Sequence, residues 1–383
     1  MRGQRHGYRP GKQALIIGID ASRAFQNDRT GTENYSRELI EALLELPEAK
    51  KHHWRLYSRE NIPWPRLWTQ GGLALEILKH PPDVLFIPAH TLPILRPSRV
   101  RTVVTIHGLE YEYLPQYYQF PQKLYLNKST EYAVRQADRL IAVSSWTKTQ
   151  LADRLGADPK KITVIHEGIN PKFTNSQFSI LNSDYKRQIR HKYNLPKNYI
   201  LFVGTIQPRK NLVRLIQAFS QIPIRSDLVG KPTRSDLEVN LVLAGKLGWM
   251  YDEILSAPKK FGVSNRVKFI GRVADADLAA VYKMAKIFVW PSLMEGFGLP
   301  VLEAMTLGIP VICSNRGALP EVAGKAAILV DPEDINGLTE AIKLVLVSED
   351  LREGLIEAGY RQAARFSWIK AAKQTLAVLT EKW

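Results

Sequence analysis

The sequence contains a single cysteine and no long apolar run. Cys313 is alone among 383 residues, which excludes an internal disulfide and any metal cluster built on several thiolates. No stretch approaches the roughly 18 consecutive apolar residues that a membrane-spanning helix needs. Together with 45% hydrophobic and 23% charged residues, these absences predict a globular protein of a reducing compartment, which we expect to be the cytoplasm.

The opening residues do not have the pattern of a secretory signal. The first 12, MRGQRHGYRPGK, are basic, but the apolar run at 14–19 is shorter than the apolar core of a signal peptide and is followed by Asp20. We therefore expect residues 1–12 to be a disordered basic leader with no targeting role.

Positive charge is concentrated in the first half of the chain. The formal net charge is +16, and residues 1–195 hold 29 Lys and Arg against 18 Asp and Glu, which leaves 24 against 19 for the remainder. A basic half is compatible with nucleic acid, with an anionic lipid surface or with a plain solvated surface. Because the basic residues are scattered and no nucleic-acid recognition motif is legible, we expect no nucleic acid. Peripheral contact with the inner face of the membrane stays a hypothesis.

Short apolar runs alternate with longer amphipathic segments, a pattern typical of parallel sheets with helical crossovers. Since 383 residues exceed the usual size of one domain, we expect two doubly wound α/β domains. We place the boundary between them in a polar and basic stretch, which gives domains of residues 13–185 and 186–365. The expected strands are 14–19, 54–57, 83–87, 101–106, 139–143, 162–165, 199–203, 239–244, 267–270, 287–290, 310–313 and 327–330.

The stretch from Val289 to Pro310, VWPSLMEGFGLPVLEAMTLGIP, carries two glutamates separated by seven residues. We expect Glu295 on a turn and Glu303 in the first turn of a helix that begins near Pro300. The backbone N–H groups of residues 296–299 would lack helical partners, and such a helix start attracts anions, phosphate above all. Two carboxylates beside an anion site indicate a sugar nucleotide. The alternative is a pair of acid–base groups for hydrolysis.

Two further positions follow expected strands of the first domain. Gly31 and Thr32 precede an amphipathic helix, where a glycine lets a phosphate approach the backbone closely; an ordinary turn with Thr32 as helix cap is the alternative. His107 follows the strand at 101–106, at the edge of the sheet where ligands of open α/β folds bind. An imidazole there can bond a sugar hydroxyl, although a lone histidine is often only structural.

Candidate cations follow expected strands of the second domain. Arg209 and Lys210 lie between the strand at 199–203 and the next helix, and Lys246 follows the strand at 239–244. A guanidinium and an ammonium together can clamp a pyrophosphate and stabilise it as a leaving group. A surface charge pair is the alternative for the dipeptide taken alone.

No metal site is predicted. Asp275 and Asp277 have the spacing by which some glycosyltransferases hold a divalent cation. They precede a helical run at 278–284, however, so we expect them to cap that helix instead. Glu110 and Glu112 have no partners at metal-ligand spacing either.

These motifs together resemble the retaining glycosyltransferases of family 4, which have the GT-B fold. The similarity runs from about Ile17 to Phe366, and its most specific part is the double-glutamate stretch from Glu295 to Glu303. Four further segments match in order: Thr30–Tyr35, His107, Val203–Thr205 with Pro208–Asn211, and Gly317–Glu321.

The resemblance implies a role for each candidate residue. Glu303 would bind the nucleotide ribose, Glu295 the hydroxyls of the donor sugar, and Arg209 with Lys210 the diphosphate, while His107 would contact the transferred sugar. The C-terminal helix, 366–383, would cross back onto the N-terminal domain, and the family needs neither metal nor cofactor. The catalytic set is then His107, Glu295, Arg209 and Lys210, and the donor-binding set is Gly31, Thr32, Lys246, Gly296, Phe297, Gly298, Leu299 and Glu303.

The resemblance is strongest to bacterial mannosyltransferases of cell-surface polysaccharide synthesis, so the expected donor is GDP-mannose and the expected acceptor a glycan or lipid-linked sugar. Two positions depart from that group: Gln207 stands where glutamate is common, and Gly108 where aspartate often follows the histidine. UDP-glucose, or another UDP-sugar, is therefore the alternative donor. A sugar-nucleotide epimerase and a non-catalytic anion-binding protein are rivals from other classes, which turnover with and without an acceptor would separate.

Overall fold

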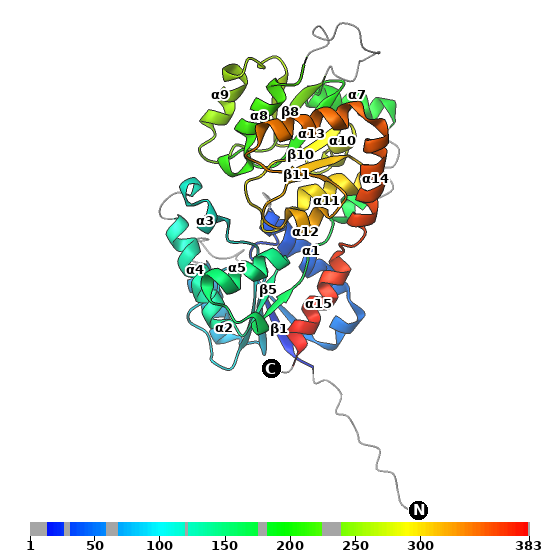
Figure 1. Cartoon of the computed structure of the whole chain (residues 1–383). Coiled ribbons are helices and arrows are strands. Elements are labelled where there is room, and N and C mark those ends of the chain that lie inside the picture. The colour runs from blue at the N-terminus through cyan, green and yellow to red at the C-terminus, as the bar shows by residue number, and fades with distance from the viewer. Residues whose placement is uncertain are drawn as a thin grey trace, which may run out of the picture.

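The computed structural model describes residues 14–26, 31–58, 68–118, 122–174, 182–223 and 239–381. It has two α/β domains, placed one above the other in Figure 1, and each is built on a six-stranded parallel sheet. The expectation of two doubly wound domains is thus confirmed. The expected leader at 1–12 lies outside the described residues.

The first sheet has the strand order β2-β1-β3-β4-β5-β6, with every neighbouring pair parallel. All four residues of its β3 are buried, as expected for a parallel sheet covered by helices on both faces. Each expected strand of this domain is present to within two residues. The strands are β1 Ile16–Asp20, β2 His53–Tyr57, β3 Val84–Ile87, β4 Arg101–Ile106, β5 Arg139–Ala142 and β6 Ile162–Val164.

Helices cover this sheet on both sides. Helix α1 buries the side chains of Tyr35, Leu39 and Leu43, which recur at helical spacing along its sheet-facing side. The helices of the chain up to residue 174 are α1 Gly31–Glu45, α2 Ala74–Lys79, α3 Glu110–Tyr113, α4 Gln122–Gln136, α5 Ser145–Leu155 and α6 Pro171–Thr174.

The second sheet has the order β12-β11-β10-β7-β8-β9, again all parallel. Its expected strands are all present. They are β7 Tyr199–Val203, β8 Asn240–Ala244, β9 Val267–Gly271, β10 Ile287–Trp290, β11 Val311–Ser314 and β12 Ile328–Val330. The helices that follow residue 182 and precede 364 are α7 Ser183–Lys192, α8 Leu212–Ser220, α9 Asp252–Lys260, α10 Leu278–Lys283, α11 Leu299–Thr306, α12 Leu319–Ala323, α13 Ile335–Val347 and α14 Glu349–Ala363.

The order of the second sheet reverses at β7. From β7 the chain adds β8 and β9 on one side, and then returns to place β10, β11 and β12 on the other. The carboxyl ends of β7 and β10 are therefore neighbours at a topological switch point, where open α/β sheets bind their ligands. The segments that leave these two strands carry Arg209, Lys210 and Glu295.

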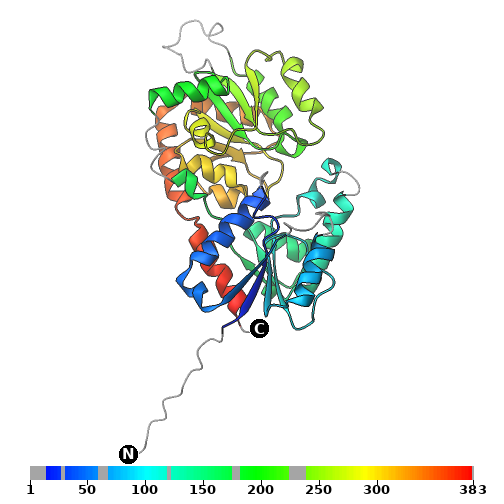
Figure 2. The ribbon, with the colours of Figure 1, turned by 180° about the vertical axis from the view of Figure 1, so that it is seen from behind.

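The last helix, α15 (Trp368–Thr380), lies against α1 of the first domain. Figure 2 shows the two side by side from behind, and the rings of Tyr35 and Trp368 meet edge to face with 5.6 Å between their centroids. The domain boundary that was expected at 185/186 falls within α7.

Two local expectations about helix starts are wrong. Asp277 precedes α10 but its carboxylate makes no cap bond; it accepts hydrogen bonds from Lys192 Nζ and the Tyr193 hydroxyl, both at 2.7 Å, because α7 packs beside α10. Glu303 lies beyond the first turn of α11, since the helix begins at Leu299. Within the described residues no helix combines the length and apolarity needed to span a bilayer.

Candidate active site

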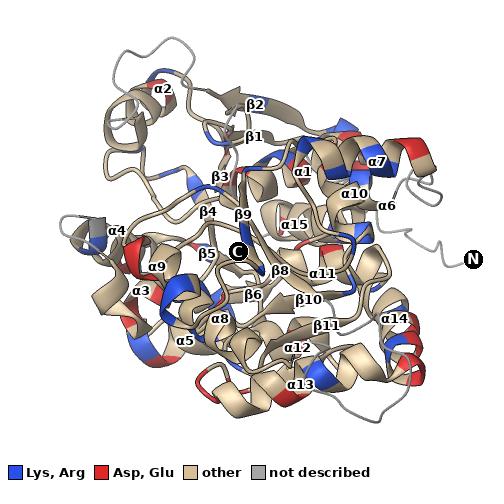
Figure 3. Cartoon of the chain, turned by 90° about the horizontal axis from the view of Figure 1, so that it is seen from above, with Lys and Arg blue, Asp and Glu red and all other residues tan. Residues whose placement is uncertain are grey.

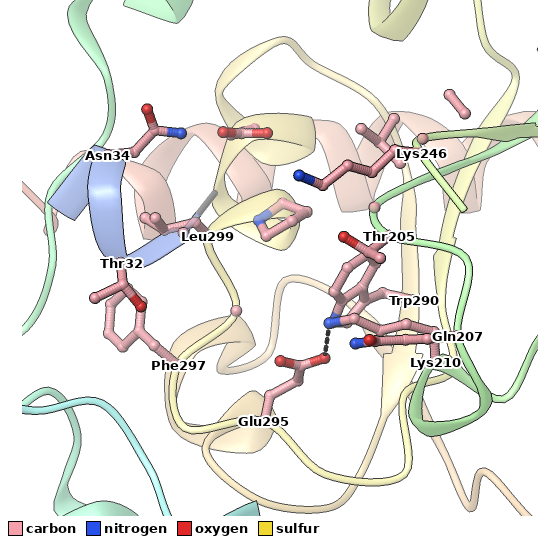
Figure 4. Close-up of a pocket in the computed structure, with 18 of the residues that line it drawn as sticks. Thr32, Asn34, Thr205, Gln207, Lys210, Lys246, Trp290, Glu295, Phe297 and Leu299 are labelled. Atoms are coloured by element: carbon pink, nitrogen blue, oxygen red, sulfur yellow. Dashed lines mark hydrogen bonds and ion pairs between the residues drawn. The ribbon is translucent and has the colours of Figure 1, made fainter. Parts of the chain in front are cut away.

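A cavity of about 750 Å³ lies between the two domains, and all twelve expected site residues line it. They arrive from five places: the start of α1, the ends of β4, β7 and β8, and the loop from β10 into α11. Figure 4 shows Glu295 and Lys210 joined on one side of the cavity, with Thr32 and Phe297 across it. Residues spread over most of the chain thus converge on one volume, large enough for a substantial small molecule.

An ion-paired group of three side chains forms one wall. Glu295 Oε1 lies 2.5 Å from Lys210 Nζ, and Glu295 Oε2 lies 2.9 Å from Arg209 Nη1. At most 14% of any of these side chains is exposed. The two cations thus retain a net positive charge over the single carboxylate, in a place where solvent screens it weakly.

Hydrogen bonds of Asn211 fix the turn that carries Arg209 and Lys210. Residues Pro208–Lys210 form a short 3₁₀ turn that ends at Asn211, whose φ is 61°. The Asn211 side-chain amide donates to the carbonyl oxygens of Pro291 and Pro332, at 3.1 and 2.6 Å. An asparagine tolerates the left-handed conformation, so this residue both permits the turn and ties it to the segment after β10.

Burial and charge act on these groups in opposite directions. Burial alone would raise the pKa of Glu295, but the positive charges of Arg209 and Lys210 outweigh burial and hold the pKa at about 2. Burial and the neighbouring Arg209 lower the pKa of Lys210 to about 8, against the raising effect of Glu295. Burial also acts to lower the pKa of Arg209, yet Glu295 and Glu110 raise it above its usual range. The carboxylate thus keeps both cations charged near neutral pH.

Lys210 also lies over an aromatic ring. Its Nζ is 4.3 Å from the centroid of the Trp290 ring, a cation–π contact at the end of β10. A Cβ atom at Gly204 would lie 2.9 Å from the same ring, so a glycine at this position leaves room for the Trp290 side chain. From the sequence, Trp290 was expected only as the last residue of a strand, and its contact with Lys210 was not foreseen.

Several buried polar atoms of the cavity wall lack partners. Among the described residues, Gln207 Oε1, Arg209 Nε and Trp290 Nε1 are buried and make no hydrogen bond. Buried polar atoms are nearly always hydrogen-bonded in folded proteins. The wall beside the cations is therefore polar and incompletely hydrogen-bonded.

The loop amides were expected to be open to an anion, and for Gly296 this is wrong. The Gly296 N–H donates to Glu110 Oε1 of the other domain, at 2.8 Å. The carbonyl oxygen of Gly296 accepts from the hydroxyl groups of Ser144 and Thr147, at 2.8 and 3.3 Å. The amide does attract a negative group, but one that the first domain supplies. The sequence pattern gave no sign of this contact, since Glu110 stood out there only as a rejected metal ligand.

His107 lines the cavity with both ring nitrogens already partnered. Nδ1 lies 3.3 Å from Glu167 Oε1, and Nε2 lies 3.0 Å from the carbonyl oxygen of Pro88. Because a carbonyl oxygen can only accept, Nε2 carries a proton. The Tyr35 ring meets the imidazole edge to face at 4.5 Å. These contacts fix the orientation of the imidazole, and its contact with a sugar stays a prediction.

Glu303 lies on α11 at another part of the wall. Its Oε2 accepts from the Tyr282 hydroxyl at 2.9 Å, and burial raises its pKa above the ordinary value, against the effects of Lys172 and Tyr282. The group is thus a carboxylate fixed by one hydrogen bond, with acceptor capacity left over. Its binding to a ribose also stays a prediction.

Opposite these groups, α1 presents its first turn. A Cβ atom at Gly31 would meet none of the described residues within 4 Å, and Gly31 lines the cavity. Lys246 reaches toward the same volume from the end of β8 (Figure 4). The geometry thus gathers cations, a helix start and acceptor groups around one polar volume, an arrangement suited to a phosphorylated sugar.

Comparisons with known proteins agree with this geometry. Residues 185–362 match the family of glycosyl transferases group 1, and residues 32–173 match Glycosyltransferase Family 4. The chain is 31% identical to the O-antigen chain mannosyltransferase B of Escherichia coli, over 94% of this chain and 98% of that protein.

Two solved structures show the same fold. Sucrose-phosphate synthase from Thermosynechococcus elongatus has a TM-score of 0.71 at 21% identity, over 95% of this chain and 98% of that one. Anabaena HepE in complex with UDP-glucose has a TM-score of 0.68 at 17% identity, over 96% and 99%. Since both domains match and one relative aligns along nearly the whole chain, the protein belongs to glycosyltransferase family 4 and has the GT-B fold.

Proposed function

We propose that the protein transfers mannose from GDP-mannose, with retention and without a metal, onto a glycan or lipid-linked acceptor in cell-surface polysaccharide synthesis. The carrying observation is the buried group of Arg209, Lys210 and Glu295 at the switch point of the second sheet. The choice of mannose is supported by the similarity to the Escherichia coli mannosyltransferase.

In this proposal the fixed cations take the place of a metal ion. Arg209 and Lys210 hold the diphosphate of the donor and stabilise its negative charge as the bond to the sugar breaks. Because Glu295 and burial already fix both side chains, little reorganisation is needed when the diphosphate arrives.

The step balances without a covalent enzyme intermediate. The oxygen of an acceptor hydroxyl forms a bond to the anomeric carbon on the face from which the diphosphate leaves, and the carbon–oxygen bond to phosphate breaks. The leaving phosphate oxygen takes the acceptor proton. Glu295 stabilises the positive charge that develops on the sugar, so the two glutamates act as positioning and stabilising groups and not as an acid–base pair.

A thermal-shift panel of GDP, UDP and ADP tests the donor class. A ligand that binds only the folded protein raises its melting temperature according to concentration and Kd. We expect GDP to give the largest shift; a larger shift with UDP would replace GDP-mannose by UDP-glucose or another UDP-sugar. Turnover without any acceptor would identify an epimerase, and nucleotide binding without release in the presence of acceptor glycans would identify a binding protein.

We also propose that the first domain rests on an anionic membrane surface. An apolar patch on this domain is formed by Leu75, Leu78, Ile94, Leu95, Leu124 and Tyr125, each between 48% and 64% exposed. The loop that carries Ile94 is hydrogen-bonded on both sides. The backbone N–H of Ile94 donates to the side chain of Gln70, and the Tyr125 hydroxyl of α4 donates to Thr91. Exposed Lys79 and Arg99 lie in the same segments, which suits an anionic lipid surface. Elsewhere Lys and Arg are spread over both domains (Figure 3).

The same loop connects the apolar patch to the cavity. It begins after β3 at Pro88, whose carbonyl oxygen bonds His107. A lipid-linked acceptor held at the membrane would thus lie near the site. Sedimentation with vesicles of anionic and of neutral lipid tests this: the variant Ile94→Ser with Leu95→Ser should lose binding to anionic vesicles. The matched control is Leu344→Ser with Val347→Ser, equally exposed on α13; equal binding by both variants would contradict the assignment.

A further inference from the structure

Glu110 occupies a position in the cavity that the proposed mechanism does not use. It begins α3, three residues after His107, and its side chain reaches across to the second domain. There Oε1 accepts the N–H of Gly296, the residue that follows Glu295 in sequence. Among the described residues no hydrogen bond is made by the other oxygen, Oε2, and Glu110 lines the cavity. One oxygen therefore anchors the carboxylate and the other is available to a ligand.

Two glycines create the space for this contact. A Cβ atom at Gly108 would lie 2.6 Å from Glu110 Oε1, and one at Gly296 would lie 1.7 Å from the carbonyl oxygen of His107. Both distances are far below a normal contact, so side chains at either position would push the two domains apart or displace the carboxylate. Gly108 has a φ of 156°, which also disfavours other residues. The carboxylate is thus built into the cleft.

The charge of Glu110 decides which part of a donor it can face. A carboxylate repels a phosphate, and the diphosphate is drawn instead to Arg209 and Lys210. The hydroxyl groups of a sugar donate hydrogen bonds, and an ionised carboxylate is a strong acceptor of them. Glu110 lies between the loop after Glu295 and the segment of His107, the two places to which contacts with the sugar are assigned. The transferred hexose is the part of the donor that fits there.

We infer that Glu110 is a specificity-determining residue for the donor hexose: its carboxylate, anchored on the Gly296 amide, accepts hydrogen bonds from the sugar hydroxyls. This inference rests on the proposed function. It gives the first domain a second contact with the transferred sugar, beside the one predicted for His107. Which hexose is transferred then depends on the position of Glu110 Oε2.

The test uses Glu110→Gln, which keeps the size of the side chain and an oxygen acceptor for the Gly296 N–H but removes the charge. The matched control is Glu112→Gln, an exposed glutamate on the same short helix. Two quantities are measured on the full chain: the Kd of GDP by calorimetry, and kcat/KM with GDP-mannose and with GDP-glucose. The Kd of GDP reports the nucleotide and diphosphate contacts alone, since GDP lacks the transferred hexose.

We expect Glu110→Gln not to weaken GDP binding, since the loss of a negative charge that acts on Arg209 favours the diphosphate. It should lower kcat/KM for GDP-mannose by roughly ten- to a hundredfold, the value of one charged hydrogen bond. The preference for mannose over glucose should fall as well. An equal weakening of GDP binding would mean that Glu110 only holds the loop, and activity equal to that of Glu112→Gln would also overturn the inference. Absence of transfer by the wild-type chain with GDP-mannose, GDP-glucose and UDP-glucose would overturn the proposed function itself.

Discussion

The ammonium group of Lys210 lies 2.5 Å from the carboxylate of Glu295, in a wall that also holds Arg209. The carboxylate thus pairs with the same cations that we assign to the donor diphosphate. The arrangement keeps both cations charged and oriented in the absence of a ligand. It also means that the charge of Glu295 affects diphosphate binding although the glutamate is assigned to the sugar.

Replacing Lys210 by Met should weaken the binding of GDP by about 1.5–3 kcal/mol, the usual value of a charge-assisted hydrogen bond. The fold should persist because Arg209 remains paired with Glu295. Calorimetry with GDP measures the loss. Lys343→Met, which removes a partly exposed lysine paired with Glu340 on α13, is the control, and equal GDP affinities in the two variants would remove Lys210 from the diphosphate site.

The affinity for GDP should depend on pH through Lys210. The pKa of its ammonium group is lowered to about 8 in the ligand-free protein, and the diphosphate binds the charged form. Affinity is therefore full below that pKa and falls as pH rises through it, by up to about tenfold per pH unit. Calorimetric titrations across this range measure the fall.

Two variants sharpen the pH prediction. Lys210→Arg should flatten the profile because a guanidinium stays charged at every pH of interest. Glu295→Gln removes a charge that raises the pKa of Lys210, so the fall should move to lower pH. A profile that is the same in the wild type and in Lys210→Arg would show that another group titrates.

Truncating Glu303 should weaken the binding of GDP and leave the binding of pyrophosphate unchanged. If Glu303 binds the ribose, Glu303→Ala removes a contact that GDP makes and pyrophosphate does not. Tyr282→Phe is the matched variant, since it removes the partner hydroxyl at 2.9 Å but leaves the carboxylate. We expect calorimetry to show a loss of about 1.5–3 kcal/mol for GDP in Glu303→Ala, and a much smaller one in Tyr282→Phe. Unchanged GDP affinity in Glu303→Ala would refute the ribose assignment.

Gly296→Ala should abolish transfer, because its Cβ would lie 1.7 Å from the His107 carbonyl oxygen. The clash falls between two backbone segments of different domains, so it cannot be relieved by a side-chain rotation. Gly354→Ala on α14, where a Cβ meets nothing within 4 Å, should instead stabilise the protein by about 0.5–1 kcal/mol. Turnover and thermal unfolding of both variants check this. Full activity of Gly296→Ala would mean that the domains do not approach this closely during transfer.

Much of the fold could be predicted from the sequence because parallel strands are buried on both faces. Each such strand appears as a continuous apolar run, such as Tyr199–Val203, between polar or glycine-containing segments. The convergence of the site residues could be predicted for a related reason. Arg209 and Lys246 both follow strands of the second sheet, whose carboxyl ends meet at one edge, and His107 follows a strand at the same edge of the first sheet.

Tertiary structure decided which of these groups touch. The bond from Gly296 to Glu110 spans 186 positions, and no local pattern reports how closely two domains approach. Asp277 was expected to cap a helix, but the packing of α7 gave its carboxylate stronger partners in Lys192 and Tyr193. The stretch from Glu295 to Glu303 shows both what the sequence predicts and what only tertiary structure decides. Sequence alone predicted that Glu295 and Glu303 would lie close together, because a strand, a turn and a helix can be read locally, and both residues do line one cavity. Only the assembled domains decided that Glu295 pairs with Arg209 and Lys210, since the contact depends on two neighbouring strands at the switch point.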